Sequence, residues 1–222
     1  MVTHRVRNSS CAAELIAALH LTRKFFNRDA ITVARALLGK LLIRREGRKL
    51  LAWRIVEDEA YLGALDPAAH AYNGRTARNA VLFGPPGHAY VYFIYGNHYC
   101  TNVSCTPEGD GGGVLLRAME PVLGRTEMAK LRGVVLSDPS RTSQLRLISS
   151  GPGRMSEALG ITRERDNGKD LTDARSDLWL ADDGYRAERI ATSKRIGIKK
   201  AIDEPLRFVI AGNAFVSGPR LL

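Results

Sequence analysis

The spacing of hydrophobic positions changes several times along the chain between the period of a helix and that of a strand. Helical spacing covers residues 12–21 and 27–45, with Asn27 or Asp29 as candidate N-cap and Gly39 as candidate stop of the second helix. Strand-like spacing predicts a sheet from segments 40–45, 51–63, 89–96, 99–105 and 112–121. Further helices are predicted at 124–134 and 151–161, and short strands at 178–183, 188–198 and 205–212. Because helices and strands do not alternate regularly, the pattern predicts an α+β fold with an antiparallel sheet.

Residues 89–102 contain four of the seven tyrosines of the chain: Tyr90, Tyr92, Tyr95 and Tyr99. In a strand, Tyr90 and Tyr92 share one face, and the following Gly96-Asn97 pair allows a tight antiparallel turn. Tyr95 then lies at the tip of the hairpin. Tyrosines on a strand buried on both faces are ordinary core residues. A ring at a solvated tip buries little surface, so Tyr95 is instead a candidate for contact with a ligand.

Three consecutive carboxylates, Glu57, Asp58 and Glu59, interrupt an otherwise basic chain. Strand alternation places Glu57 and Glu59 on one face with Ile55, and Asp58 on the opposite face. A solvated edge strand with arginine partners is one interpretation. The other is a carboxylate that activates water beside a nucleic-acid groove, because a carboxylate at such a groove otherwise only repels phosphate.

Size and charge narrow the class of partner. The 222 residues, 45% of them hydrophobic, suffice for one substantial core, so a single domain is expected. With 33 Lys and Arg against 23 Asp and Glu, the net charge of +10 favours a polyanion such as nucleic acid. Two basic segments are candidates to clamp phosphates, although solvated charge explains them equally well. Their residues are Arg75 and Arg78 in one, and Lys194, Arg195, Lys199 and Lys200 in the other.

The cysteines and the N-terminal residues indicate a cytosolic setting. The three cysteines, Cys11, Cys100 and Cys105, have no framework spacing, so reduced thiols and no disulfide are expected. Near the N-terminus, Glu14 and His20 interrupt an apolar run that is too short to span a bilayer. Residues 1–20 are therefore interpreted as a leader plus a helix, and no membrane partner is expected.

Several cofactor sites lack their sequence signatures. The glycines of residues 108–114 match neither a phosphate loop nor the dinucleotide spacing, so a hairpin loop is the better interpretation. His98, Cys100 and Cys105 lack the usual zinc spacing and a fourth ligand nearby. Zinc deaminases, which also extrude bases, need HxE and PCxxC motifs, and neither occurs. No metal, nucleotide or other cofactor is predicted.

Five blocks, in this order, resemble the alkyladenine (3-methyladenine) DNA glycosylase family: EAYLG with AAH, RNAVLFGPPGHAYVYFIYG, GDGGGVLLRAMEP, GPGRMSEALGI and PLRFVIAG. The match runs from about Leu21 to about Ser217, so residues 21–222 are expected to form one glycosylase domain and residues 1–20 lie outside it. The resemblance implies a compact domain with a curved antiparallel sheet, surrounding helices and a β-hairpin that projects into the DNA minor groove. It implies a monofunctional enzyme that hydrolyses the N-glycosidic bond of alkylated or deaminated purines.

The resemblance also assigns roles to single residues. Glu59 resembles the general base that activates water for attack on the sugar C1′, and Arg117 resembles the arginine that helps hold this water. Tyr61, His70 and Tyr92 resemble the residues that sandwich and hydrogen-bond the extruded base. The family pattern places no lysine at the nucleophile position, so the expected product is an abasic site without strand cleavage.

Further positions concern specificity and insertion into DNA. Asn102 resembles the asparagine that crowds the 2-amino group of guanine, and Tyr95 resembles the residue that replaces the extruded base in the stack. Asn97 stands beside this wedge where the family has an apolar methionine, and Asp58 replaces an uncharged residue. Asp58 would raise the pKa of Glu59 if both faced the pocket, which strand alternation argues against.

The expected partner is double-stranded DNA that contains damaged purines, bound by a monomer in the cytoplasm. The protein would associate with the nucleoid in a bacterium and lie in the nucleus in a eukaryote. Candidate lesions are 3-methyladenine, 7-methylguanine, hypoxanthine and 1,N6-ethenoadenine. One alternative is a damaged-DNA binding protein without catalysis, although a buried carboxylate has no use in a pure binder. Another is an RNA-binding protein that stacks splayed bases on aromatic rings.

Overall fold

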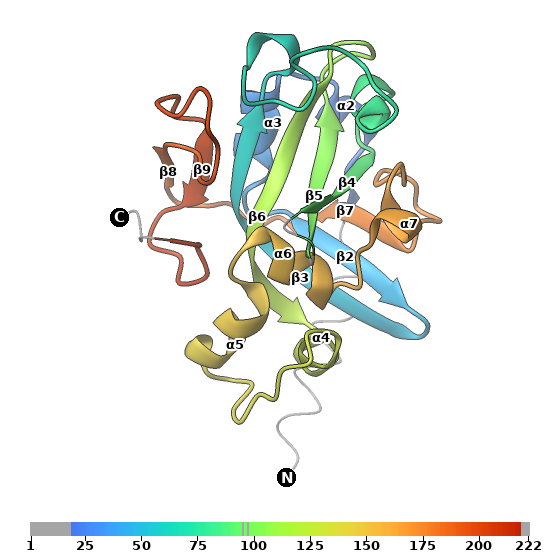
Figure 1. Cartoon of the computed structure of the whole chain (residues 1–222). Coiled ribbons are helices and arrows are strands. Elements are labelled where there is room, and N and C mark those ends of the chain that lie inside the picture. The colour runs from blue at the N-terminus through green and yellow to red at the C-terminus, as the bar shows by residue number, and fades with distance from the viewer. Residues whose placement is uncertain (1–18, 95, 97, 219–222) are drawn as a thin grey trace.

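The computed structural model of the protein describes residues 19–94, 96 and 98–218. In this part of the chain, nine antiparallel strands form one curved, open sheet in the order β1-β7-β2-β3-β6-β5-β4, while β9 pairs with β3 and β8 with β9 (Figure 1). The strands are β1 (Leu19–His20), β2 (Leu41–Glu46), β3 (Lys49–Tyr61), β4 (Ala89–Ile94), β5 (His98–Cys105), β6 (Gly112–Leu123), β7 (Leu178–Asp182), β8 (Ile190–Ser193) and β9 (Arg207–Ile210). The α+β class and the antiparallel sheet predicted from the sequence are confirmed.

The acidic strand β3 lies inside the sheet. Its first half pairs with β2, its second half pairs with β9 on the same side, and β6 runs along its other side. Register shifts between β3 and β6 fall at Ile55/Glu57 and Glu57/Asp58, which is the pattern of a β-bulge beside the acidic residues. The interpretation of this segment as a solvated edge strand is therefore wrong.

Helices pack on the face of the sheet that carries the main core. They are α2 (Arg23–Phe26), α3 (Ala30–Leu37), α4 (Arg125–Leu131), α5 (Thr142–Ser149), α6 (Pro152–Ala158) and α7 (Arg163–Asp166), with 3-10 turns η1 (Gly63–Leu65) and η2 (Ala80–Phe83). Helix α3 packs against β3 and β6, and α6 packs against β5 and β6 (Figure 1). Apolar side chains of both helices, such as Val33 and Leu37 of α3 and Met155 of α6, belong to this one core.

Local signals set the start and end of α3. The side chain of Asp29 accepts a hydrogen bond from the N–H of Thr32 at 2.8 Å, which identifies Asp29 as the N-cap. The helix ends before Gly39, whose φ of +87° turns the chain into β2. The helix expected over residues 12–21 is wrong at its end, because Leu19 and His20 pair with β7 as a strand, and residues 12–18 lie outside the described part.

Three helices, α2, α5 and α7, were absent from the sequence prediction. In α5 the apolar pattern is short and mixed with serines, so only the buried Leu145 and Ile148 mark its inner face. In α7 the single turn depends on Thr162, whose side chain accepts a hydrogen bond from the N–H of Arg165. Short helices of this kind are stabilised by tertiary packing rather than by propensity.

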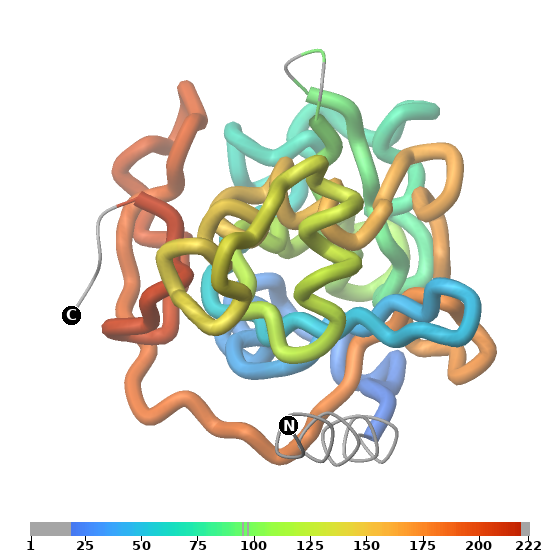
Figure 2. Tube along the Cα trace, turned by 90° about the horizontal axis from the view of Figure 1, so that it is seen from below, coloured from blue at the N-terminus to red at the C-terminus, as the bar shows by residue number. Residues whose placement is uncertain are grey.

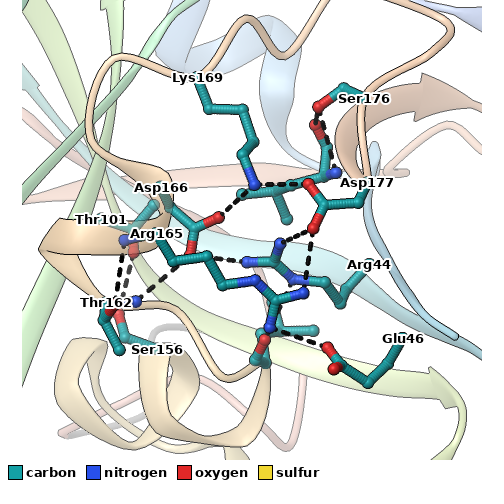
Figure 3. Close-up of polar contacts among 12 residues, drawn as sticks. Arg44, Glu46, Thr101, Ser156, Thr162, Arg165, Asp166, Lys169, Ser176 and Asp177 are labelled. Carbon is teal, nitrogen blue, oxygen red and sulfur yellow. Dashed lines mark hydrogen bonds and ion pairs between the residues drawn. The ribbon is translucent and has the colours of Figure 1, made fainter.

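A network of ion pairs fixes the segment around α7 to the sheet (Figure 3). At its centre the buried Arg44 of β2 pairs with Asp166 at 2.8 Å and with Asp177 at 3.0 Å. Lys169 bridges the same two carboxylates, and Arg165 extends the network to Glu46. The segment held in this way covers the outer edge of β4, where Lys169 and Gly168 exchange backbone hydrogen bonds with Ala89.

Strands β4 and β5 form the hairpin expected from the sequence, with Ile94 opposite His98. Gly96 in the connection has a φ of +76°, as the predicted tight turn requires. The ends of both strands lead away from the body of the molecule at the top of Figure 2. The flanking residues Tyr95 and Asn97, predicted to enter DNA, lie outside the described residues.

Candidate active site

The carboxylates of β3 are buried, and they point to opposite faces of the sheet. Glu57 and Glu59 both contact Arg117 of β6, at 2.9 Å and 3.2 Å, so they share a face as alternation predicts. Asp58 lies on the other face, where its cross-strand neighbours are Leu116 and Phe208. Burying three consecutive carboxyl groups requires a separate solution for each of them.

Glu57 is held by structural partners. Its carboxylate accepts hydrogen bonds from Arg117 and Arg207, at 2.9 Å and 2.8 Å. The backbone N–H and the hydroxyl of Ser217 add two more, at 2.5 Å and 2.8 Å. This set of donors ties β3 to β6, β9 and the segment after β9, and it leaves Glu57 without free acceptor capacity for a substrate.

Glu59 is held more loosely, and its partners line a cavity. The backbone N–H of Ile196 donates to Oε1 at 2.8 Å, and the hydroxyl of Tyr61 donates to Oε2 at 2.9 Å. The guanidinium of Arg117 lies 3.2 Å from Oε1. A carboxylate offers about four lone-pair positions, so these donors leave room for one more hydrogen bond. That position suits a water molecule to be activated.

The pKa of Glu59 reflects two opposed effects. Burial raises the pKa of this carboxyl above its ordinary value, and the positive charge of Arg117 and the N–H of Ile196 oppose the rise. Burial is the larger effect, so the pKa remains raised. A raised pKa brings a general base closer to its operating pH and increases its affinity for a proton.

Asp58 has a different environment. Its side chain is completely buried, and neither of its oxygens has a hydrogen-bond partner among the described residues. Burial, followed by the charges of Glu57 and Glu59, raises the pKa of Asp58 well above its ordinary value. A carboxyl group in this position is favoured in its neutral, protonated form.

A cavity of about 330 Å³ opens beside Glu59 and is of the size that takes a small molecule. It is lined by Tyr61, Ala68, Ala69, His70, Leu82, Tyr90, Tyr92, Ile94, Cys100, Asn102, Gly111, Gly113, Leu115, Arg117, Pro152, Ile196, Gly197 and Ile198. The predicted residues Tyr61, His70, Tyr92, Asn102 and Arg117 are therefore brought together at one cavity.

The aromatic side chains of this cavity form one cluster. The ring centroids of His70 and Tyr92 lie 4.5 Å apart, with the rings edge to face. The ring centroids of Tyr90 and Tyr92 lie 5.5 Å apart. The Nδ1 atom of His70 is 2.9 Å from the hydroxyl of Tyr90. Burial and the charge of Arg78 lower the pKa of His70, which favours a neutral imidazole at neutral pH. The cavity thus offers neutral aromatic surfaces to a planar ligand.

Asn102 has a fixed orientation at the floor of the cavity. Its side chain is buried, and Nδ2 donates a hydrogen bond to the backbone oxygen of Tyr90 across the hairpin at 3.2 Å. This hydrogen bond restrains the orientation of the amide in the free protein.

The predicted phosphate contacts fall into two groups. Arg75, Arg78, Lys194 and Lys199 are exposed, and Lys194 already pairs with Asp203 at 2.6 Å. Arg195 is buried, and its guanidinium pairs with the carboxylate of Asp66. The sequence prediction grouped Arg195 with its basic neighbours because only the fold reveals its partner.

Some residues of the site were missing from the sequence prediction. Tyr90 and Cys100 line the cavity, and the backbone N–H of Ile196 reaches Glu59. Strand alternation could have placed Tyr90 beside Tyr92 in the cavity instead of in the core. For Ile196 the sequence gives no signal, because the interaction uses a backbone group from a segment 137 residues away.

A metal site and a membrane-spanning helix are both absent from the part of the chain that the structure describes. Over residues 19–94, 96 and 98–218, no group of three or more His, Cys, Asp and Glu side chains is arranged to hold a metal ion. Cys100 and Cys105 are buried free thiols, and Cys11 lies outside the described residues. Among the helices of the described chain, none has the length and apolar character needed to cross a membrane.

Comparisons with known proteins agree on one family. The sequence pattern of the family described as Methylpurine-DNA glycosylase (MPG) matches residues 24–214. A protein of Koribacter versatilis (strain Ellin345) is 60% identical over 202 residues, which cover 91% of this chain and 95% of the relative. Relatives from Burkholderia cenocepacia (strain HI2424) and Methanoculleus marisnigri (strain ATCC 35101 / DSM 1498 / JR1) are both 47% identical, over 97% and 89% of this chain and 100% and 98% of their own lengths. All three are provisionally named 3-methyladenine DNA glycosylases.

Proposed function

Because the chain belongs to the methylpurine-DNA glycosylase family and is a DNA glycosylase of the 3-methyladenine type, we propose that Glu59 is its general base. The reaction is hydrolysis of the N-glycosidic bond of a damaged purine, which leaves an abasic site for base excision repair. The observation that carries the proposal is the buried Glu59–Arg117 pair, 3.2 Å apart, at the wall of an aromatic cavity.

The cavity supports a mechanism in which the base leaves the helix. A purine inside a duplex cannot present its glycosidic bond to a side chain, so it is first extruded at a cost of a few kcal/mol. Stacking between Tyr61, His70 and Tyr92 returns roughly 1 to 3 kcal/mol per base. Electron-poor purines stack well on such rings, and damage weakens pairing or improves the leaving group. The proposed substrates are therefore 3-methyladenine, 7-methylguanine, hypoxanthine and 1,N6-ethenoadenine.

The chemical step uses the ionised form of Glu59. Its carboxylate accepts a proton from water, and the resulting nucleophile attacks the sugar C1′ as the bond to the base breaks. Positive charge develops on the sugar, and the carboxylate stabilises that charge electrostatically. Arg117 opposes the effect of burial on the pKa of Glu59, which maintains the ionised form.

Exclusion of normal guanine is assigned to Asn102. Its side chain is buried at the floor of the cavity, and its hydrogen bond to the backbone of Tyr90 prevents it from turning away. This amide would crowd the 2-amino group of guanine and so discourage excision of the normal base. 7-Methylguanine carries the same group, but its positively charged ring is a better leaving group, which offsets the crowding.

The hairpin is assigned the task of holding the DNA open. Insertion of Tyr95, with Asn97 beside it, would occupy the gap left by the extruded base. The exposed residues Arg75, Arg78 and Lys199 would contact backbone phosphates on the two sides of this wedge. We further propose that a monomer in the cytoplasm binds damaged duplex DNA in this way.

The test is single-turnover base release from duplexes that carry hypoxanthine or 1,N6-ethenoadenine opposite thymine, in EDTA, by the wild type and by Glu59→Gln. Proton transfer by a positioned side chain typically contributes about 10²- to 10⁴-fold to the rate, so a loss in this range is expected for the variant. Glu59→Gln should still bind the duplex, and wild type should leave alkali-labile abasic sites.

The same experiment distinguishes the alternative function. If wild type and Glu59→Gln both bind the lesion duplex but neither releases a base, even from an alkylated duplex, the protein is a damaged-DNA binder without catalysis. If Glu59→Gln releases base at the wild-type rate, Glu59 is not the general base. Release of base from single-stranded RNA in preference to duplex DNA would overturn the proposed substrate.

A further inference from the structure

Arg195 is built into the molecule in a way that a phosphate contact does not require. Its side chain is completely buried, and Nη2 donates to Oδ1 of Asp66 at 2.9 Å while Nη1 donates to Oδ2. Nη1 also donates to the backbone oxygen of Ala60 at 3.0 Å. This bidentate pairing compensates the charge of Arg195 inside the protein. None of the N–H groups engaged in it is available to DNA.

Asp66 is equally committed to this arrangement. Besides Arg195, its carboxylate accepts hydrogen bonds from the backbone N–H groups of Ala68 at 3.0 Å and Leu62 at 3.3 Å. Although burial raises the pKa of Asp66, the hydrogen bonds from Arg195 and from Ala68 bring it below its ordinary value. Asp66 is therefore the ionised partner that holds the turn after β3 in shape.

The pair joins three segments that form walls of the cavity. Ala60 and Tyr61 end β3, Asp66 precedes the segment that carries His70, and Arg195 belongs to the segment that continues to Ile198. The guanidinium carbon of Arg195 also lies 4.7 Å from the ring centroid of Tyr61. This distance is within the range of a cation–π contact, which fixes the plane of the ring.

The next residue along the chain connects the pair to the proposed general base. Ile196 directly follows Arg195, and its N–H donates to Oε1 of Glu59 at 2.8 Å. The position of this N–H depends on where Arg195 is anchored, because one peptide unit separates the two. Tyr61, the second donor to Glu59, touches the same guanidinium. Two of the donors to the Glu59 carboxylate thus depend on the Asp66–Arg195 pair.

We propose that the Asp66–Arg195 pair is a clamp that positions Tyr61 and the Ile196 N–H on Glu59, and that Arg195 does not contact DNA phosphate. Both residues act through their neighbours and are positioning residues. The inference rests on the proposed function of Glu59. Arginine suits this task because its planar fork fixes direction as well as distance, which the single ammonium of lysine does not.

A pH profile separates positioning from a purely structural role. Loss of the Ile196 N–H removes an interaction that favours the ionised form of Glu59, so the acid limb of single-turnover base release should move to higher pH. We expect a shift of about one pH unit in Asp66→Asn, which keeps the shape of the side chain. Arg195→Lys keeps the positive charge but loses the two-point pairing with Asp66, so it should also move the acid limb to higher pH. Asp66→Asn leaves the other charged and titratable groups around Glu59 chemically unchanged: Arg117, Glu57, Asp58, Tyr61, Cys100, Arg195 and Arg207. The lost negative charge of Asp66 would by itself move the limb to lower pH, so a shift to higher pH reports the lost donors.

The buried pair Arg44–Asp166 is the matched control. Both its side chains are completely buried, and they lie in the network of Figure 3, away from the residues that line the cavity. Asp166→Asn and Asp66→Asn should both lower the melting temperature, and Asp166→Asn should leave the acid limb at the wild-type pH. All profiles are measured well below the melting temperature of the least stable variant. Equal profiles for Asp66→Asn and wild type would overturn the clamp.

A salt titration tests the second half of the proposal. Each phosphate contact contributes about 0.9 to the slope of log K against log salt, so Arg195→Gln should leave the slope for duplex DNA unchanged. A slope reduced by about 0.9 would make Arg195 a phosphate contact and overturn the proposal. A failure of the proposed role of Glu59 would give a different result. In that case Glu59→Gln would release base at the wild-type rate.

Discussion

At the scale of single residues, two neighbouring carboxyl groups on β3 have different chemistry because strand alternation points them to opposite faces. Glu59 meets an arginine, a phenol and a backbone N–H, whereas Asp58 meets the apolar layer under α3. On that side Phe208, its cross-strand neighbour, lies under the guanidinium of Arg35 of α3, with 5.5 Å between guanidinium carbon and ring centroid. Environments of this kind separate a proton acceptor from a neutral acid.

Asp58 makes the stability of the protein dependent on pH. Its pKa is raised in the folded state, so the folded protein holds this proton at pH values where the unfolded chain has lost it. The free energy of unfolding therefore decreases as pH rises from the ordinary pKa of aspartate toward the raised folded value. The slope approaches about 1.4 kcal/mol per pH unit for one proton.

Asp58→Asn should remove this dependence, because asparagine has the same shape and does not titrate. Denaturant unfolding of both proteins between pH 5 and 8 should show that the difference in stability, variant minus wild type, increases with pH. Groups that titrate equally in both proteins cancel in the difference. A difference that is constant over this range would mean that Asp58 is ionised in the folded protein.

At the scale of elements, the turn after β3 shapes one end of the cavity through a backbone contact. Gly63 begins η1 with a φ of +62°, and a Cβ atom at this position would overlap the backbone oxygen of Asp110. The close approach holds the β5–β6 connection against the segment that carries Asp66. Gly111, at the end of that connection, and Gly113, at the start of β6, line the cavity.

Gly63→Ala should therefore destabilise the protein more than Gly74→Ala. Gly74 also has a left-handed φ, of +87°, but no atom lies within 4 Å of where its Cβ would be. Both variants bear the backbone strain, and only Gly63→Ala adds steric overlap, worth about 1 to 3 kcal/mol in a well-packed site. If chemical denaturation shows equal losses of unfolding free energy in the two variants, the turn accommodates the added Cβ atom at no extra cost.

At the scale of the whole molecule, the fold brings distant segments to one cavity in a chain of net positive charge. The net charge of +10 attracts DNA without selecting a sequence or a lesion. The cavity is where residues from β3, β4, β5, β6 and the segment before β9 meet, and the proposed selection of lesions rests on it.

Exposed basic residues near the cavity should determine the salt dependence of DNA binding. Arg75→Gln and Lys199→Gln are each expected to reduce the slope of log K against log salt by about 0.9, as the loss of one phosphate contact does. Arg48→Gln is the control, because Arg48 is exposed at the β2–β3 turn, about 40 Å along β3 from Tyr61. Equal slopes for all three variants and the wild type would remove Arg75 and Lys199 from the interface.

The sequence by itself determined the features that depend on local patterns. The alternation of side chains along a strand placed Glu57 and Glu59 on one face. The tight turn that Gly96 allows predicted the β4–β5 hairpin. Side-chain capping by Asp29 defined the start of α3. These features depend on residues close together in the chain, so their physics can be evaluated without the fold.

Only the tertiary structure decided which charges are buried and with which partners. The acidic strand became a central one because β2, β6 and β9 pair with it. Arg195, one basic residue among several in the sequence, became a buried partner of Asp66, 129 residues away. The physical reason is that the free energy of a charge depends on burial and on the nearest opposite charge, and both are set by contacts between distant segments.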